Sequence, residues 1–246
     1  MTPLYQEIQK NCLIDPTIES CGLVLEISSG LIVEPCKNIS EFPRHHFLIS
    51  SEEQREKEFK GKLVGFYHSH TTDTDFSWLD KAVSEATKLT CFLYKIPSGE
   101  LSEHHPNGWK APYLGRQFVP GIFDCTVLVQ DYYKKELNVC LPNLNHKYRY
   151  NPISDMEILK TWGYSEGNKE LTDYFLNNGF VLVEKPHHHD VILMRGVHVK
   201  CPIHCLIYLD GGRILHHPSK SESKTEVYDR AHQKLTSCIL RHKSQV

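Results

Sequence analysis

The chain has 246 residues and a formal net charge of −2, and 40% of its residues are hydrophobic and 24% are charged. This composition is typical of a globular protein and gives no reason to expect nonspecific binding to nucleic acid. No apolar run approaches the length of a membrane span and no signal-peptide pattern opens the chain, so we expect a protein kept in a cytoplasm or delivered by a larger assembly. The length fits two domains of ordinary size.

Nine Cys residues are scattered along the chain without a paired Cys-x-x-Cys framework. In a chain without an export signal, this pattern indicates free thiols. Their apolar neighbours predict core positions for Cys21, Cys36, Cys91, Cys140 and Cys238.

The first part of the chain alternates between helical and strand patterns, which predicts an α/β domain with a mixed sheet. Several Pro and Gly residues between positions 106 and 121 interrupt any regular element, so we expect a first domain over 1–108 and a second over 109–246. In the first domain we expect helices over 4–14, 51–59 and 77–89, and strands over 22–27, 31–35, 46–49, 63–70 and 90–96, with one more strand after a turn at 97–99.

The second domain is expected to be α+β, because its helices come first and its strands come later. A tight hairpin turn is expected at 210–212, and a final strand is expected within a solvated end over 225–246. The other expected elements are helices over 124–137, 153–162 and 168–177, and strands over 180–183, 190–194, 203–209 and 213–217.

The segment His68-Ser69-His70 ends an apolar strand pattern, and Ser77 and Asp80 open the next helix. Residues two apart on a strand point to one face, so both imidazoles can converge on one ion. Two His and one carboxylate leave a fourth position for water, which is typical of catalytic zinc. The residues alone leave two alternatives open. Ser77 and Asp80 also fit a plain capping box, and 16 His residues make about one His-x-His pair expected by chance.

A distant Glu, then His-Ser-His, then Ser-x-x-Asp, resembles the motif of the JAMM (MPN+) metalloproteases. The matching Glu is Glu19, within the run 18–23. Thr71 stands where that family usually has Pro, and the spacer between His70 and Ser77 is one residue shorter than usual. The resemblance implies Glu19 as the general base toward a zinc-bound water and Ser77 as a group that helps to hold the oxyanion. It implies three zinc ligands, His68, His70 and Asp80.

A second set of reactive residues lies in the second domain. Cys125 begins the helix expected over 124–137, and a helix N-terminus lowers the pKa of a thiol, which suits a nucleophile. His204 and His216 lie on paired strands and can reach one point, one as base and one as its orienting residue. In a chain so rich in His, the spacing alone leaves purely structural roles open.

The local sequence around Cys125 resembles the nucleophile box of the NlpC/P60 cysteine peptidases, with Thr126 in place of the usual Ser. The resemblance implies a papain-like domain with Cys125 as nucleophile, His204 as base and His216 as the residue that orients His204. His217 competes with His216 for the third role, because alternation along a strand lets only one face the site. The segments that carry the resemblance are 121–129, 189–194, 204–209 and 214–217.

A JAMM-like domain followed by an NlpC/P60-like domain resembles the lambda-type phage tail tip assembly proteins, and residues 113–118 fit the linker of that family. The resemblance implies zinc as cofactor and two hydrolase sites: a zinc (iso)peptidase acting on a tail protein, and a Cys-His-His peptidase acting on peptidoglycan stem peptides. The implied partners are other tail tip proteins, and the implied location is the host cytoplasm during assembly, or the virion tail tip. Two alternatives are a non-catalytic assembly factor with relic sites and a deubiquitinase-like enzyme.

Overall fold

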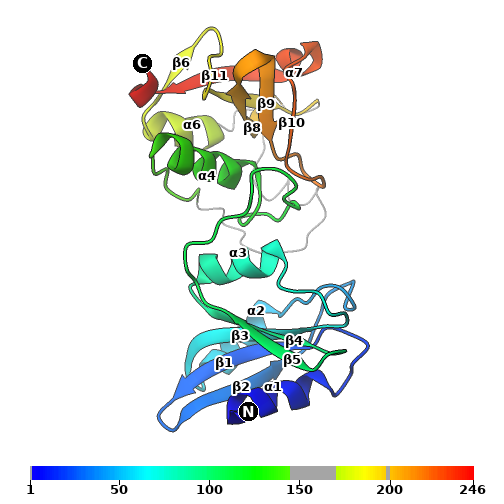
Figure 1. Cartoon of the computed structure of the whole chain (residues 1–246). Helices are drawn as coiled ribbons and strands as arrows, with labels where there is room; N and C mark the ends of the chain where they lie inside the picture. Colours follow the sequence, from blue (N-terminus) through cyan, green and yellow to red (C-terminus); the bar gives the residue numbers. More distant parts are fainter. Residues whose placement is uncertain (1, 145–169, 198–199) are drawn as a thin grey trace. The chain divides into compact units, whose positions relative to one another are not determined.

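A computed structural model describes residues 2–144, 170–197 and 200–246. The chain divides into two compact units, Met1–Lys110 and Ala111–Val246 (Figure 1). In the described part of the chain, every helix is too short or too polar to cross a membrane. The helix expected over 153–162 lies outside the described residues.

The first unit is built on a five-stranded mixed sheet with strand order β2-β1-β3-β4-β5. β3 and β4 run parallel, whereas the other neighbouring pairs are antiparallel. The expected mixed sheet is therefore confirmed. Its strands are β1 (Cys21–Ile27), β2 (Gly30–Cys36), β3 (Lys62–His70), β4 (Thr90–Lys95) and β5 (Glu100–His104), and its helices are α1 (Pro3–Cys12), α2 (Ser51–Glu58) and α3 (Trp78–Thr87).

Helices α1 and α3 lie on opposite faces of this sheet (Figure 1). Ile8 of α1 packs on one face against Val24 and Tyr67. On the other face, Val83 of α3 packs against Phe66 and Cys91. Because side chains alternate along β3, His68 and His70 lie on the same face as Phe66, under α3. The fold therefore places both imidazoles beside the start of α3.

The strand expected over 46–49 is wrong. The side chain of Asn38 donates a hydrogen bond to the carbonyl of His46 at 3.0 Å and accepts one from the N–H of Leu48 at 3.1 Å. The N–H of Ile39 donates to the carbonyl of Leu48 at 2.9 Å. These bonds satisfy backbone groups that would otherwise join a sheet, and the segment forms an ordered loop.

The second unit has a six-stranded antiparallel sheet with strand order β10-β9-β8-β7-β11-β6. The expected tight turn is a short 3-10 helix, η1 (Asp210–Gly212), in which Gly211 and Gly212 have φ of 72° and 70°. The strands are β6 (Phe180–Val183), β7 (Val191–Arg195), β8 (Pro202–Leu209), β9 (Arg213–His216), β10 (Lys224–Val227) and β11 (Thr236–His242), and the helices are α4 (Cys125–Leu137), α6 (Glu170–Asn177) and α7 (Arg230–Leu235).

Helices α4 and α6 cover one face of the second sheet, and α7 lies on the other (Figure 1). The expected final strand exists as β11, but it lies inside the sheet between β7 and β6 and its Leu240 is fully buried. The structure also contains β10 and α7, which were not expected because Lys224–Val227 and Arg230–Leu235 are short and mostly polar.

The nine cysteines are free thiols. Cys21 and Cys91 are buried and Cys36 and Cys238 are half-buried, but Cys140 is exposed, so its expected core position is wrong. The left-handed residue Asn138 ends α4, and in the irregular segment that follows, Val139 and Leu141 pack against the core while Cys140 between them is exposed.

Candidate active sites

The first unit brings His68, His70 and Asp80 into one buried cluster, with one ligand atom of each within 4.8 Å of the others. The Nε2 atom of His68 lies 3.2 Å from Nε2 of His70 and 3.4 Å from Oδ1 of Asp80. His70 Nε2 lies 3.7 Å from Asp80 Oδ2. Ligand atoms held about 2.0–2.1 Å from a tetrahedral zinc ion lie about 3.3 Å apart. The cluster therefore fits three ligands of such an ion.

The second nitrogen of each imidazole has a partner that orients the ring. Nδ1 of His70 donates to the carbonyl of Thr74 at 2.9 Å. Nδ1 of His68 lies 3.8 Å from the buried thiol of Cys91, and the ring stacks on Phe47 with centroids 4.7 Å apart. Such outer contacts set the tautomer of a metal-binding histidine. Both Nε2 atoms are thus presented toward Asp80.

Asp80 is held by a capping box at the start of α3. The N–H of Ser77 donates to Asp80 Oδ2 at 2.7 Å, and the N–H of Asp80 donates to Ser77 Oγ at 3.1 Å. Oδ1 remains directed at His68. The capping role and the ligand role, which the sequence left as alternatives, are therefore compatible in this structure. Because Ser77 Oγ caps the helix, its hydroxyl hydrogen is the part still able to donate elsewhere.

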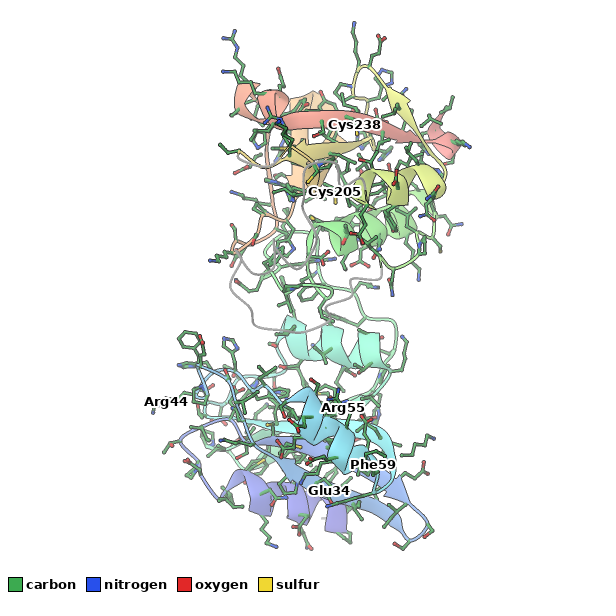
Figure 2. All side chains as sticks on the ribbon, turned by 180° about the vertical axis from the view of Figure 1, so that it is seen from behind. Glu34, Arg44, Arg55, Phe59, Cys205 and Cys238 are labelled. Atoms are coloured by element: carbon green, nitrogen blue, oxygen red, sulfur yellow. The ribbon has the colours of Figure 1, made fainter. Side chains whose placement is uncertain are left out.

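The short spacer after His70 is tied to the unit at several points. The hydroxyl of Thr71 donates to the carbonyl of Arg44 at 3.1 Å (Arg44 is labelled in Figure 2). The N–H of Ser98 donates to a carboxylate oxygen of Asp73 at 3.1 Å. The next residue but one, Asp75, accepts from Lys95 Nζ at 2.5 Å. The start of α3 therefore lies beside the two histidines although this spacer is one residue shorter than is usual in the JAMM motif.

Glu19 precedes β1 and borders this cluster. Its Oε1 lies 4.0 Å from Nε2 of His70, and the residue is buried. Burial raises the pKa of Glu19 to about 7, while His68 acts to lower it and Asp80 acts to raise it. A carboxyl group with a pKa near neutrality can both accept and return a proton at physiological pH.

The histidines of the cluster differ in charge preference. Burial disfavours the charged form of His68, but its interactions with Asp80 and Cys91 together outweigh burial and raise its pKa. Burial and the neighbouring His68 together lower the pKa of His70. When neutral His70 donates its Nδ1–H to the carbonyl of Thr74, its Nε2 atom has the free lone pair that a metal ligand needs.

In the second unit, Cys125 is the first residue of α4 and is half-buried. Asp124 caps the helix: its Oδ1 accepts from the N–H groups of Thr126 and Val127, each at 2.9 Å. Its Oδ2 accepts from the N–H of Gly121 at 2.7 Å. Asp124 thus fixes the start of α4, and this start holds the thiol of Cys125 in place.

The thiol of Cys125 is activated by its neighbours. A hydrogen bond from the thiol of Cys205 lowers its pKa, burial opposes this, and the hydrogen bond and charge of His204 lower it further, with a net shift well below the usual range. Cys205 lies on β8 and is fully buried (Figure 2). Burial raises the pKa of Cys205, so that thiol keeps its proton and acts as the donor.

His204 contacts the third residue of the expected set. Its Nε2 lies 3.1 Å from Nδ1 of His216, which leaves Nδ1 of His204 for the thiol. Burial and the neighbouring His204 lower the pKa of His216 to about 4, so it is neutral at physiological pH. His217 lies elsewhere: it is fully buried, and its ring meets Phe118 edge-on with centroids 5.3 Å apart. The structure therefore brings His216, and not His217, to His204.

Two contacts of these sites were not found from the sequence. Glu226 of β10 accepts from Nε2 of His216 at 3.1 Å, and Cys91 of β4 reaches His68. A third contact, Cys205 of β8 beside Cys125, was likewise not found from the sequence. A hollow of about 380 Å³ beside α2 belongs to neither cluster and is lined by Glu52, Arg55, Glu56, Glu58 and Phe59. Arg55 and Phe59 are labelled in Figure 2.

The second unit matches a known protein family. Residues 110–241 match the family model described as NlpC/P60 family. The chain is 31% identical over 226 residues to a protein named tail tip assembly protein K, from Escherichia phage N15, and the match covers 92% of this chain and 88% of that protein.

A crystal structure of an NlpC/P60 family protein from Bacillus cereus is 12% identical, with a TM-score of 0.35. The match covers 96% of this chain but 66% of that one, so the chain spans just under two thirds of its length.

Proposed function

Because the chain belongs to the NlpC/P60 family and is a homologue of phage tail tip assembly protein K, we propose that it is a two-site hydrolase that serves the assembly of a phage tail tip. One observation carries the proposal: the 3.1 Å bond between His204 Nε2 and His216 Nδ1, beside the activated thiol of Cys125. This is the arrangement of nucleophile, base and orienting residue found in cysteine peptidases.

In the proposed reaction, His204 accepts the proton of Cys125, and the thiolate attacks the carbonyl carbon of a peptide bond. His204 then donates this proton to the leaving amine, which gives a thioester on Cys125. A water molecule, deprotonated by His204, hydrolyses the thioester and restores the thiol. His216 holds the ring of His204 in place throughout by accepting its Nε2–H.

We assign peptide stems of peptidoglycan as the substrate of this site. Its membership of the NlpC/P60 family supports that assignment. Other tail tip proteins are its proposed partners, since its relative is named for tail tip assembly. A protein with this role works in the host cytoplasm while tails are built, or at the tail tip of the virion.

The first unit is proposed to be a JAMM-like zinc peptidase or isopeptidase. Zinc would be held by Nε2 of His68, Nε2 of His70 and a carboxylate oxygen of Asp80, and bound zinc lowers the pKa of water toward neutrality. Glu19, whose burial raises its pKa to about 7, can hold a proton next to the ligands and return it to a leaving group. The hydroxyl of Ser77 lies in the same capping box and can donate to a developing oxyanion.

Digestion of purified peptidoglycan by the full-length protein, followed by mass analysis of the muropeptides, tests the second site. We expect new fragments cut within the peptide stems, and their absence with the variant Cys125→Ser. Cys140→Ser is the matched control, because Cys140 is exposed and lies outside the site. Identical muropeptides with and without the intact protein would contradict the substrate assignment and favour a non-catalytic assembly factor.

A further inference from the structure

We propose that Glu226 is a positioning residue of the cysteine site: it fixes the tautomer of His216 and so leaves His204 as a base toward Cys125. The inference rests on the proposed peptidase function of these residues. It adds a fourth member to the set, from a strand that the sequence analysis did not predict.

The sheet places His204, His216 and Glu226 on one face. β8, β9 and β10 are neighbours, and the register pairs Leu206 with His216 and His216 with Lys224. Residues two apart on a strand share a face, so His204 lies with Leu206 and Glu226 lies with Lys224. The contacts run across these strands as a chain: His204 Nε2 to His216 Nδ1 at 3.1 Å, and His216 Nε2 to Glu226 Oε2 at 3.1 Å.

The positions of the hydrogens on His204 and His216 determine which atom donates in each of these hydrogen bonds. An ionised carboxylate can only accept, so His216 carries its hydrogen on Nε2 and directs it at Glu226. The Nδ1 atom of His216 then has a lone pair and accepts from Nε2–H of His204. A neutral His204 with its hydrogen on Nε2 has a lone pair on Nδ1, which is the atom left for Cys125. Glu226 therefore selects the form of His204 that can take the thiol proton.

The opposite tautomer would disable the site. If His216 carried its hydrogen on Nδ1, it would donate to Nε2 of His204. Neutral His204 would then carry its own hydrogen on Nδ1, and it could not accept a proton from Cys125. Two neutral imidazoles do not by themselves choose between these two arrangements, whereas a carboxylate at Nε2 of His216 does.

The surroundings keep Glu226 ionised and in place. A hydrogen bond from Lys224, with Nζ at 2.6 Å from Oε1, and the nearby His216 lower the pKa of Glu226 against its partial burial. His232 Nε2 lies 3.7 Å from Oε2, and its Nδ1 bonds to Asp229 at 2.8 Å. Lys224, His216 and His232 are the charged and titratable groups that contact the carboxylate in the described part of the chain. Cys125 faces Cys205, His204 and Asp124.

The test measures the pH dependence of iodoacetamide alkylation at Cys125 in the full-length protein, with the modified peptide quantified by mass spectrometry. We expect Glu226→Gln and Glu226→Ala to slow alkylation near neutral pH about tenfold, as expected for the loss of a charge-assisted hydrogen bond, and to move its pH profile upward. The control is Glu222→Gln, because Glu222 bonds to Gln117 outside the chain of contacts.

A second readout reports the tautomer directly. Long-range ¹H–¹⁵N NMR of ¹⁵N-histidine-labelled protein should show His216 with its hydrogen on Nε2, and a mixture of both tautomers in Glu226→Gln. A merely structural role would leave this signature unchanged. Gln has nearly the same shape as Glu, so the Glu226→Gln variant can still be measured if Glu226→Ala does not fold.

The outcomes separate this inference from the peptidase function. If both Glu226 variants keep the native alkylation profile and tautomer while His204→Ala slows alkylation, the role of Glu226 is overturned and the site stands. If His204→Ala also leaves alkylation of Cys125 unchanged, the proposed nucleophile and base fail together, and the inference fails with them.

Discussion

Ser77 and Asp80 hold each other's backbone N–H groups, at 2.7 and 3.1 Å, and Asp80 still directs its other carboxylate oxygen at His68 from 3.4 Å. One side chain thus both begins a helix and completes a candidate metal site. The two functions can be separated by substitution, because the cap also depends on Ser77 Oγ, whereas the ligand role depends on the Asp80 carboxylate.

The cap can be removed without removing the ligand. Ser77→Ala should lower the free energy of unfolding of the first unit by about 0.5–2 kcal/mol, the usual loss for a Ser cap, and should leave most of the zinc affinity. Asp80→Asn keeps an oxygen for the cap but removes the charge that attracts the ion. Compared with Ser77→Ala, Asp80→Asn should weaken zinc binding more and lower the free energy of unfolding less. Urea unfolding and zinc titration measure the two effects, and equal losses of affinity in both variants would contradict the separation.

Zinc content tests the cluster itself. Protein produced with zinc available should contain about one equivalent per chain, as expected for a site with His and carboxylate ligands, and His70→Ala or Asp80→Ala should lose it. His187→Ala is the control, because His187 belongs to a separate His-rich stretch. Less than about a tenth of an equivalent by elemental analysis in the native protein would rule out a resident zinc site.

The parts of these sites that could be predicted are those with local signals. The alternation that ends in His68 and His70, and the Ser-x-x-Asp start of α3, follow from strand and helix periods within a few residues. Asn38 shows where such reasoning fails. Its side chain forms hydrogen bonds with the carbonyl of His46 and the N–H of Leu48, which a strand over 46–49 would have used to pair with a neighbouring strand. Glu226 could not be found in this way. Its role depends on the register of three strands, and the short polar strand that carries it has no periodic signal.

Cys91 is expected to support the metal site from outside. Its thiol contacts Nδ1 of His68 at 3.8 Å, so Cys91→Ala should free that ring and weaken zinc binding about 10- to 100-fold, the range found for outer-shell partners of metal ligands. Cys12→Ala is a matched control, because Cys12 is a buried thiol of α1, which packs on the opposite face of the same sheet. Competition with a zinc chelator measures both, and equal affinities would assign Cys91 to packing alone.

Cys125 should react with iodoacetamide faster than the other eight thiols at neutral pH. The hydrogen bond from Cys205, and then His204, lower its pKa, so a larger share of it is thiolate. Exposed Cys140 provides the comparison, since it is more accessible. Cys205→Val should slow the reaction of Cys125 without changing that of Cys140. Alkylation of Cys140 at the same rate as Cys125 would count against an activated nucleophile.

His217 predicts how the stability of the second unit depends on pH. It is fully buried, and in the described part of the chain neither ring nitrogen has a side-chain hydrogen-bond partner, although the backbone of Arg116 and of Ser221 acts to raise its pKa. Burial lowers its pKa from 6.5 to about 4. The folded state therefore favours the neutral ring. Its contribution to stability is complete above pH 6.5 and is lost as the pH falls toward 4, because protonation then favours the unfolded chain.

His216, with a pKa also lowered to about 4, acts in the same direction. His217→Phe should therefore remove only part of the loss of stability at acidic pH. Between neutral pH and pH 4, its free energy of unfolding should fall by about 2–3 kcal/mol less than that of the native chain. The measurement is calorimetric unfolding of the full-length protein across this range. The same substitution at exposed His45 is the control. Parallel pH profiles for His217→Phe and the native protein would show that His217 is not held neutral by burial.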